Sequence, residues 1–294
     1  METEKRAKKG APVALAIHDL SCFGRCALTV IIPTLSVMGV QTVPIPTALL
    51  STHTGGFDGF HFRDLTEDME SIAVHLNSIG VECDAVYTGF LGSEAQINTV
   101  ARIIDMFSAS EKGRVPVLVD PVMGDDGRLY STYNREMMLG MRRLCEKADV
   151  ITPNLTEACF LTDTPYVDTR EMTEREARDY ADMLCQRLMS FGAERIVITG
   201  LHYDGNKVGT YGCDTERGIS SAFIYGSEHI DRSYPGTGDL FASVLLGELI
   251  CGDSFEKAVR RASDFTRKAI EYTSKFETPI RDGVAFEGLL RELC

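Results

Sequence analysis

The stretch VPVLVDPVMGDDG, residues 115–127, joins an uninterrupted apolar run to a glycine-rich acidic loop, and it decides the fold class. Residues 115–119 show no alternation of apolar and polar side chains, which is typical of a strand buried on both faces of a parallel sheet. Asp120 ends the run, and Pro121 stops the strand directly after it. The acidic loop alone is equally typical of a solvated turn. The stretch therefore predicts a buried strand whose carboxyl end carries acidic side chains.

The same kind of apolar run recurs along the chain, and segments with helical spacing lie between most of the runs. The runs are PVALAI, QTVPIP, DAVYTGF, VPVLVD, ADVITPN and RIVITG, and the helical segments are 65–79, 95–107, 135–145, 174–191, 238–250 and 255–273. This alternation predicts an α/β fold with a mostly parallel central sheet and helices on both faces. Short glycine-punctuated pieces over 208–225 predict antiparallel strands at one edge. Because no linker or repeat divides the chain, we expect a disordered basic tail at 1–11 and a single domain over 12–294.

Composition narrows the classes of function. The 294 residues are 44% hydrophobic and 25% charged, a normal balance for a soluble globular protein. The formal net charge of -13 argues against a nucleic-acid partner, so an anionic substrate must be held by local N–H groups, a few cations or a metal. The nine cysteines contain no C-x-x-C pair, which predicts reduced thiols. The apolar run 13–17 is too short for a signal sequence or a membrane span, so we expect a cytoplasmic protein without a membrane partner.

Polar residues follow several of the predicted strands. His18 and Asp19 follow the first run, residues 90–92 follow the run that ends in YTG, and Asn154 ends another. Ligands of open α/β sheets bind at the carboxyl ends of the strands. These residues and Asp120 are therefore predicted to share one edge of the sheet and to form a site there.

A second stretch, SYPGTGDLFAS at residues 233–243, places two glycines around Thr237 just before an apolar helix. A glycine turn that leads into a helix gathers unpaired N–H groups and the positive end of the helix dipole, which together bind anions. Asp239 then has two interpretations. It is either an acid favoured by the helix start, or a base held beside a bound anion.

Three other features each have two interpretations. Asn154 and Glu157 have the spacing of a capping box, and with Asp120 they could also supply the oxygen ligands of a magnesium site. The loop STHTGGFDGF, residues 51–60, is a flexible turn or a substrate loop with hydroxyl donors and glycine hinges. Within it, His53 is more typical of a hydrogen-bonded loop histidine than of a catalyst. Asp19 either caps the turn after the first strand or faces a bound ligand. Cys22 and Cys26 are interpreted as packing residues or as bystanders without a role.

These motifs together resemble a known group of enzymes. PGTGD, DPVMG and PNLTEA resemble the ribokinase-type small-molecule kinases, and AIHDLSCFGRCALT, STHTG, YTGFLGS and DPVMGDDGRLY resemble the pyridoxal kinases among them. The resemblance runs from about Val13 to Thr273. It implies a three-layer ribokinase-like fold, a homodimer, and ATP-dependent phosphorylation of the 5′-hydroxymethyl group of a B6 vitamer (pyridoxal, pyridoxamine or pyridoxine) in vitamin B6 salvage. It also implies Mg²⁺ as cofactor, and it leaves open whether a monovalent cation is required.

The resemblance also implies roles for individual residues. Asp239 matches the catalytic base. The N–H groups of Gly236, Thr237, Gly238 and Asp239 match the anion hole, which also contacts the nucleotide. Asp120 and Glu157 match residues that organise magnesium and phosphate, and Asn154 and Thr199 match nucleotide contacts. Asp19, Thr54 and Gly55 match vitamer contacts. Many relatives carry a hydroxyl residue where this chain has Asp19.

Chemistry supports the pairing of base and anion hole. A hydroxymethyl group is a poor nucleophile until a carboxylate takes its proton, and the charge developing on the phosphoryl oxygens needs donors already in place. One glycine turn with Asp239 supplies both. Two alternatives remain at this point: a kinase of hydroxymethylpyrimidine, which is also a flat nitrogen heterocycle with a CH₂OH group, and a non-catalytic ligand-binding relative.

Overall fold

The structure, a computed structural model, describes residues 10–110 and 113–294. The predicted tail at 1–11 lies almost wholly outside these residues. The described part folds around a nine-stranded sheet with the strand order β13-β12-β11-β10-β7-β4-β1-β2-β3. The strands are β1 (Val13–Phe23), β2 (Gln41–Thr52), β3 (Phe62–Asp64), β4 (Ala85–Thr88), β7 (Val117–Val119), β10 (Val150–Ile151), β11 (Arg195–Tyr203), β12 (Lys207–Asp214) and β13 (Phe223–Glu228).

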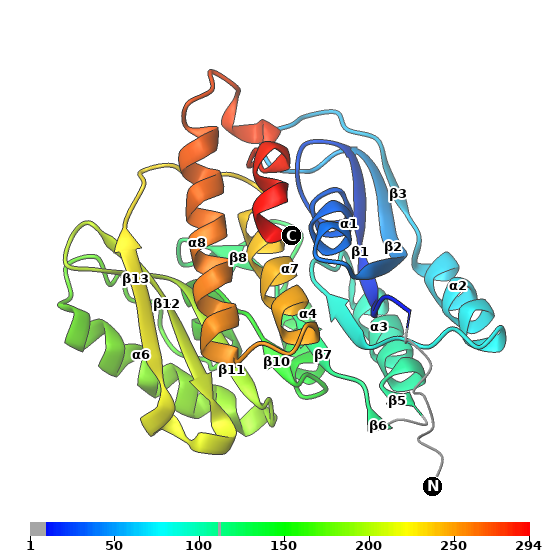
Figure 1. Cartoon of the computed structure of the whole chain (residues 1–294), viewed down its shortest axis with the longest axis horizontal. Helices are drawn as coiled ribbons and strands as arrows, with labels where there is room; N and C mark the ends of the chain where they lie inside the picture. The colour runs from blue at the N-terminus through cyan, green and yellow to red at the C-terminus, as the bar shows by residue number, and fades with distance from the viewer. Residues whose placement is uncertain (1–9, 111–112) are drawn as a thin grey trace, which may run out of the picture.

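Helices cover both faces of this sheet (Figure 1). Two short ribbons, β5–β6 (Ala109–Ser110 and Gly113–Arg114) and β8–β9 (Gly124–Asp125 and Arg128–Leu129), lie outside it. The helices are α1 (Leu28–Val37), α2 (Thr66–Ser78), α3 (Glu94–Phe107), α4 (Arg135–Cys145), α5 (Leu155–Leu161), α6 (Glu174–Leu188), α7 (Thr237–Ile250) and α8 (Phe255–Thr273), with 3₁₀ turns at Met189–Phe191, Thr215–Arg217, Ile219–Ser221, Ile280–Asp282 and Glu287–Leu293.

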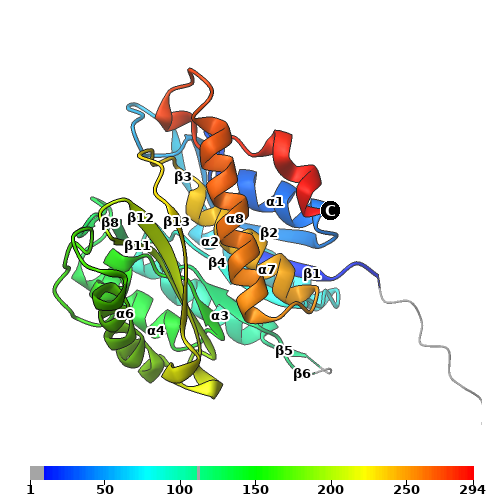
Figure 2. The same ribbon diagram turned by 60° about the vertical axis from the view of Figure 1, so that its left-hand side comes forward.

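The two faces of the sheet carry two separate cores, as the alternation of side chains along a strand requires. Leu15 and Ile17 of β1 join the core under α2 to α6, whereas Ala14 and Ala16 join the core under α1, α7 and α8. Figure 2 shows α1, α7 and α8 on one side of the strands and α3, α4 and α6 on the other. The predicted three-layer α/β fold is confirmed.

The strand directions also agree with the prediction. Strands β11, β10, β7, β4, β1 and β2 run parallel to one another. At one edge β12 pairs antiparallel with β11 and with β13, as the glycine-punctuated pieces predicted. The short β3 adds an antiparallel strand at the other edge. Every helix within 10–110 and 113–294 is too short or too polar to cross a lipid bilayer.

The predicted end of the first strand was wrong. β1 continues through Asp19 to Phe23, because β2 pairs with it over this whole length, with one irregularity between His18 and Leu20. Asp19 therefore lies inside the strand and caps no turn. The helix α1 was not predicted, because its sequence is apolar nearly all round and contains Pro33.

Candidate active site

Asp239 lies in the first turn of α7, and it is held by a segment far away in sequence. Its Oδ2 accepts a hydrogen bond of 2.8 Å from the backbone N–H of Ala27, in the connection between β1 and α1. Ala27 adopts φ +47°, a left-handed conformation that is unfavourable for a residue with a Cβ atom. Backbone strain of this kind persists only where the surrounding structure imposes it. The contact fixes one oxygen of Asp239 and leaves the other free to accept a proton.

The turn before Asp239 has the predicted form of an anion site. α7 begins at Thr237 after Gly236, which has φ +83°, so the first N–H groups of the helix have no acceptor within it. A side chain at Gly236 would overlap the carbonyl oxygen of Arg25. Gly238 is exposed, and a Cβ atom there would meet no protein atom closer than Asp120 Oδ2, at 3.8 Å. The space beside Gly238 is therefore free to hold a ligand.

These two glycines give matched variants. We expect Gly238→Ala to keep the melting temperature within a few degrees but to lower the rate of ATP turnover. The added methyl group would occupy only the space beside Gly238 that is free to hold a ligand. Gly236→Ala should lower the melting temperature, because its methyl group meets backbone and its φ is positive. Thermal unfolding and turnover measured on both variants check this. A Gly238→Ala enzyme with normal turnover would contradict the anion site.

Asp120 approaches Asp239 from the neighbouring strand end. It follows the last residue of β7, is only 6% exposed, and lies next to Gly238. Burial, together with the charge of Asp239, raises the pKa of Asp120 to about 8. Burial likewise raises the pKa of Asp239 to about 6, and the Ala27 N–H opposes this rise. The buried carboxyl group of Asp120 and the half-buried one of Asp239 therefore belong to one site, which opens to solvent at Gly238.

The capping interpretation of Asn154 and Glu157 agrees with the structure. Asn154 caps α5, its Oδ1 accepts the Glu157 N–H, and Glu157 Oε2 accepts the Asn154 N–H at 2.8 Å. Glu157 Oε1 accepts the N–H of Met123, just after Asp120. Burial raises the pKa of Glu157, with the charge of Asp120 as a further cause. Thr199 of β11 bridges to Asn154, so these residues do lie together at the carboxyl edge.

The acidic pair fits a magnesium ion held largely by phosphate and water. In the described ranges no three or more His, Cys, Asp or Glu side chains form a cluster able to hold a metal. Asp120 and Glu157 are buried carboxylates, and no ion pair joins either to a described lysine or arginine. A hard divalent cation that keeps several waters and uses one or two carboxylates suits such a pair.

Asp19 also lies within electrostatic reach of Asp239. It is 8% exposed, and its Oδ2 accepts a hydrogen bond of 3.0 Å from the hydroxyl of Ser21. Burial raises the pKa of Asp19, and the charge of Asp19 contributes to the raised pKa of Asp239. The structure thus brings the predicted ring contact close to the predicted base.

The loop after β2 is held through His53. Its Nε2 lies 2.6 Å from the carbonyl oxygen of Arg281, and its Nδ1 accepts the N–H of Gly55 at 3.1 Å. Both ring nitrogens are therefore occupied by backbone, as predicted for a loop histidine. Thr54 and Gly55 are exposed on this loop. His53 also lies close enough to lower the pKa of Asp239 slightly, which places the loop beside the base.

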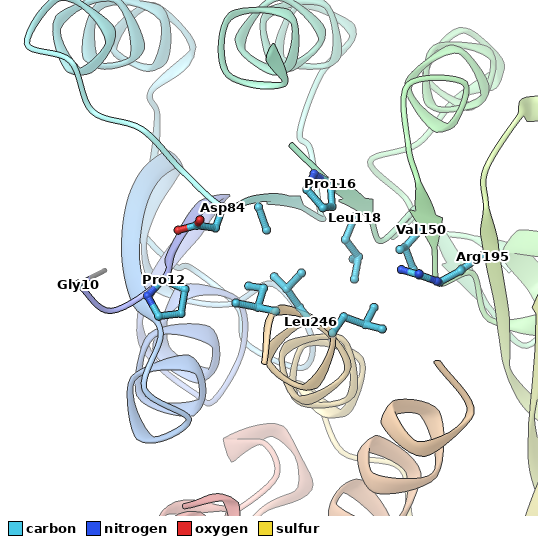
Figure 3. Close-up of a pocket in the computed structure, with 11 residues that line it drawn as sticks. Gly10, Pro12, Asp84, Pro116, Leu118, Val150, Arg195 and Leu246 are labelled. Carbon is cyan, nitrogen blue, oxygen red and sulfur yellow. The ribbon is translucent and has the colours of Figure 1, made fainter. Parts of the chain in front are cut away.

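A cavity of about 450 Å³ lies elsewhere, at the amino ends of the strands (Figure 3). It is lined by the residues before or at the starts of β4, β7, β10 and β11 and by the last turns of α7, including Leu118, Val150 and Leu246. It contains none of the predicted site residues. The candidate site is thus a set of converging turns at the opposite edge of the sheet.

Sequence comparison agrees with this geometry. A sequence profile of phosphomethylpyrimidine kinases matches residues 22–281. The chain belongs to the phosphomethylpyrimidine kinase family. The predicted resemblance to ribokinase-type kinases is thereby confirmed, and the protein is an ATP-dependent phosphotransferase that acts on a small molecule.

Three relatives illustrate the range of substrates in this family. A Bacteroides thetaiotaomicron protein, provisionally named a phosphomethylpyrimidine kinase and solved in a crystal form with pyridoxal, is 39% identical with a TM-score of 0.85, covering 96% of each chain. A pyridoxine/pyridoxal/pyridoxamine kinase of Bordetella avium is 28% identical, covering 88% of this chain and 84% of the relative. A hydroxymethylpyrimidine/phosphomethylpyrimidine kinase of Bacillus subtilis is 27% identical, covering 88% and 89%.

Sequence reasoning missed the segments that support the site. The contact of Ala27 with Asp239 spans more than 200 positions and uses a backbone N–H, which no side-chain motif reveals. The contact of Arg281 with His53 is also long-range. The turn signal Arg281-Asp282-Gly283 was the only local sign that this segment had a defined shape.

Proposed function

We propose that this kinase transfers the γ-phosphoryl group of ATP to the 5′-hydroxymethyl group of a B6 vitamer, in vitamin B6 salvage. The observation that carries the proposal is the position of Asp239, a half-buried carboxylate held by the Ala27 N–H at a helix start with free N–H groups. Asp19, buried within electrostatic reach of Asp239, supplies a partner for a polar heterocycle. The similar Bacteroides thetaiotaomicron protein, crystallised with pyridoxal, supports the choice of substrate class.

The residues divide the reaction between them. Asp239 accepts the proton of the attacking hydroxyl group as the new O–P bond forms and the bond to ADP breaks. The N–H groups of Thr237, Gly238 and Asp239 stabilise the negative charge that develops on the transferred phosphoryl group. Asp120 and Glu157 would hold Mg²⁺, which neutralises phosphate charge when it is bound. Asn154 and Thr199, which are bridged to each other, would contact the nucleotide phosphates.

The proposal includes three further expectations. A homodimer and Mg²⁺ as cofactor come from the resemblance, and a cytoplasmic location comes from the sequence. All nine cysteines lie in the described residues and none forms a disulfide, which fits a reducing compartment. Size-exclusion chromatography with light scattering tests the homodimer.

The experiment that tests the function is ATP consumption with pyridoxal, pyridoxamine, pyridoxine and hydroxymethylpyrimidine as alternative substrates. The proposal requires that at least one B6 vitamer has a higher kcat/KM than hydroxymethylpyrimidine. Hydroxymethylpyrimidine is the second candidate, because the Bacillus subtilis relative carries that activity in its name, together with the phosphomethylpyrimidine kinase activity for which the family profile is named. Preference for it would replace our proposal, and turnover of none of the four would contradict both.

Asp19→Asn should raise KM for the vitamer about 10- to 150-fold and leave KM for ATP unchanged. The charged hydrogen bond that it removes is worth about 1.5–3 kcal/mol. Asparagine still accepts the Ser21 hydroxyl, so the fold should be unaffected. Ser21→Ala is the matched control, because it removes the hydrogen bond between Ser21 and Asp19 and keeps the carboxylate. Steady-state kinetics with each substrate varied in turn measures the two KM values. An unchanged vitamer KM in Asp19→Asn would rule out the contact between Asp19 and the vitamer ring.

A further inference from the structure

Four consecutive residues after α8, Arg281–Val284, contact three turns of the candidate site. We call this segment the C-terminal clasp. The carbonyl oxygen of Arg281 lies 2.6 Å from His53 Nε2, the carbonyl oxygen of Asp282 accepts the N–H of Arg25 at 3.1 Å, and the N–H of Val284 donates to the carbonyl oxygen of Pro235 at 3.0 Å. The first contact reaches the loop after β2, the second the connection from β1 to α1, and the third the anion turn. One short segment therefore links all three.

Arg281 holds the loop after β2 through more than its backbone. Its guanidinium donates to the carbonyl oxygen of Gly56 at 3.2 Å and lies over the ring of Phe57, 4.9 Å from the ring centre. Phe57 also packs edge-on against His53, with ring centres 5.0 Å apart. The bond from His53 to the Arg281 carbonyl fixes the tautomer that leaves Nδ1 free to accept the Gly55 N–H. The positions of Gly55 and Gly56 thus depend on Arg281.

The other contacts of the clasp hold the connection that carries Ala27. Arg25 forms an ion pair of 2.6 Å with Glu287, beyond the clasp, and its guanidinium also approaches the Asp282 carbonyl. A Cβ atom on Gly283 would lie 2.7 Å from the Arg25 carbonyl oxygen, and one on Gly236 would overlap the same atom. The clasp, the connection and the anion turn are therefore packed backbone to backbone, and little space remains for any of them to move.

We propose that the C-terminal clasp positions the acceptor-binding loop, and that Arg281 is the positioning residue that sets affinity for the alcohol substrate. This inference rests on the proposed function, because Thr54 and Gly55 are predicted to contact the vitamer. Arg281 acts through the loop that carries these residues and does not act on ATP, whose predicted contacts come from other elements. Loosening the loop therefore lowers affinity for the alcohol selectively.

Arg281→Ala tests the clasp. Arg267→Ala is the matched control, because Arg267 is an arginine on α8 whose ion pair with Glu271 is solvent-exposed. We expect Arg281→Ala to raise the vitamer KM about tenfold with ATP KM unchanged, from the loss of one hydrogen bond and one cation–π contact. Arg281→Lys, which keeps a cation near Phe57, should recover part of the loss. Hydrogen exchange of the 53–57 peptide, measured by mass spectrometry, should become faster in Arg281→Ala and stay unchanged in Arg267→Ala.

The outcomes separate the clasp from the proposed function. If the wild-type enzyme phosphorylates a vitamer but Arg281→Ala has the wild-type vitamer KM, or raises both KM values equally, the clasp proposal is wrong. If the wild-type enzyme phosphorylates no vitamer, the proposed function fails. The exchange measurement then judges the clasp alone, and an unchanged rate over 53–57 would overturn it.

Discussion

Asp239→Asn should lower kcat by about 10²-fold or more while the variant still binds ATP. Asparagine has nearly the same shape as aspartate, and its side-chain oxygen can still accept the Ala27 N–H, so the anion turn should keep its geometry. What it loses is the ability to take a proton from the acceptor hydroxyl. Turnover under saturating substrates and ATP binding by calorimetry measure the two properties separately. Near-normal turnover of a folded variant would exclude Asp239 as the base.

The pH dependence of the wild-type enzyme follows from the same residue. The base must be ionised to accept a proton, and burial raises the pKa of Asp239 to about 6. Activity attributable to this group is therefore complete well above pH 6 and is lost as pH falls through about 6. The residual activity of Asp239→Asn should lack this acidic limb, because asparagine does not titrate. An identical limb in both enzymes would assign it to another group.

Much of the fold could be predicted because it depends on local patterns. Residues 135–145 and 255–273 have helical spacing throughout, and α4 and α8 have these bounds in the structure. The buried parallel strands can be recognised in the sequence as apolar runs without alternation of apolar and polar residues. The end of β1 could not be predicted in this way, since the polar residues after Ile17 look like a turn until β2 is seen to pair with them. The pairing that extends the strand is a long-range contact.

The part of the candidate site that is built from motifs at strand ends could be predicted from the sequence. Parallel strands bring their carboxyl ends to one edge, so Asp120 and Asn154 meet without any further information. The capping and functional interpretations of Asn154 and Glu157 proved not to compete, because the capping box itself fixes the carboxylate beside Asp120. The unusual conformation of Ala27 could not be read from the sequence, because nothing in an alanine indicates a positive φ.

Removal of divalent metal should abolish activity, and added Mg²⁺ should restore it, if Asp120 and Glu157 hold the ion near the phosphates. Glu157→Gln should then raise the Mg²⁺ concentration needed for half-maximal activity by about 10- to 100-fold, the usual cost of altering a residue that supports a metal site. The substitution replaces a carboxylate that is fixed by the N–H groups of Met123 and Asn154. A Mg²⁺ titration of the rate at saturating ATP measures the shift.

The chain itself supplies the control that separates a metal role from a capping role. Thr173 and Glu176 form the same capping box at the start of α6, where Glu176 is exposed and accepts the Thr173 N–H at 2.9 Å. Glu176→Gln therefore makes the same change in a capping box away from the site. Because glutamine can still accept the Thr173 N–H, we expect only a small loss of thermal stability and no shift of the Mg²⁺ titration. If Glu157→Gln behaves in the same way, with a lower melting temperature and an unchanged titration, Glu157 is only a cap. A shifted titration in Glu157→Gln alone assigns its carboxylate to the metal, because the change from carboxylate to amide in a capping box is common to both variants.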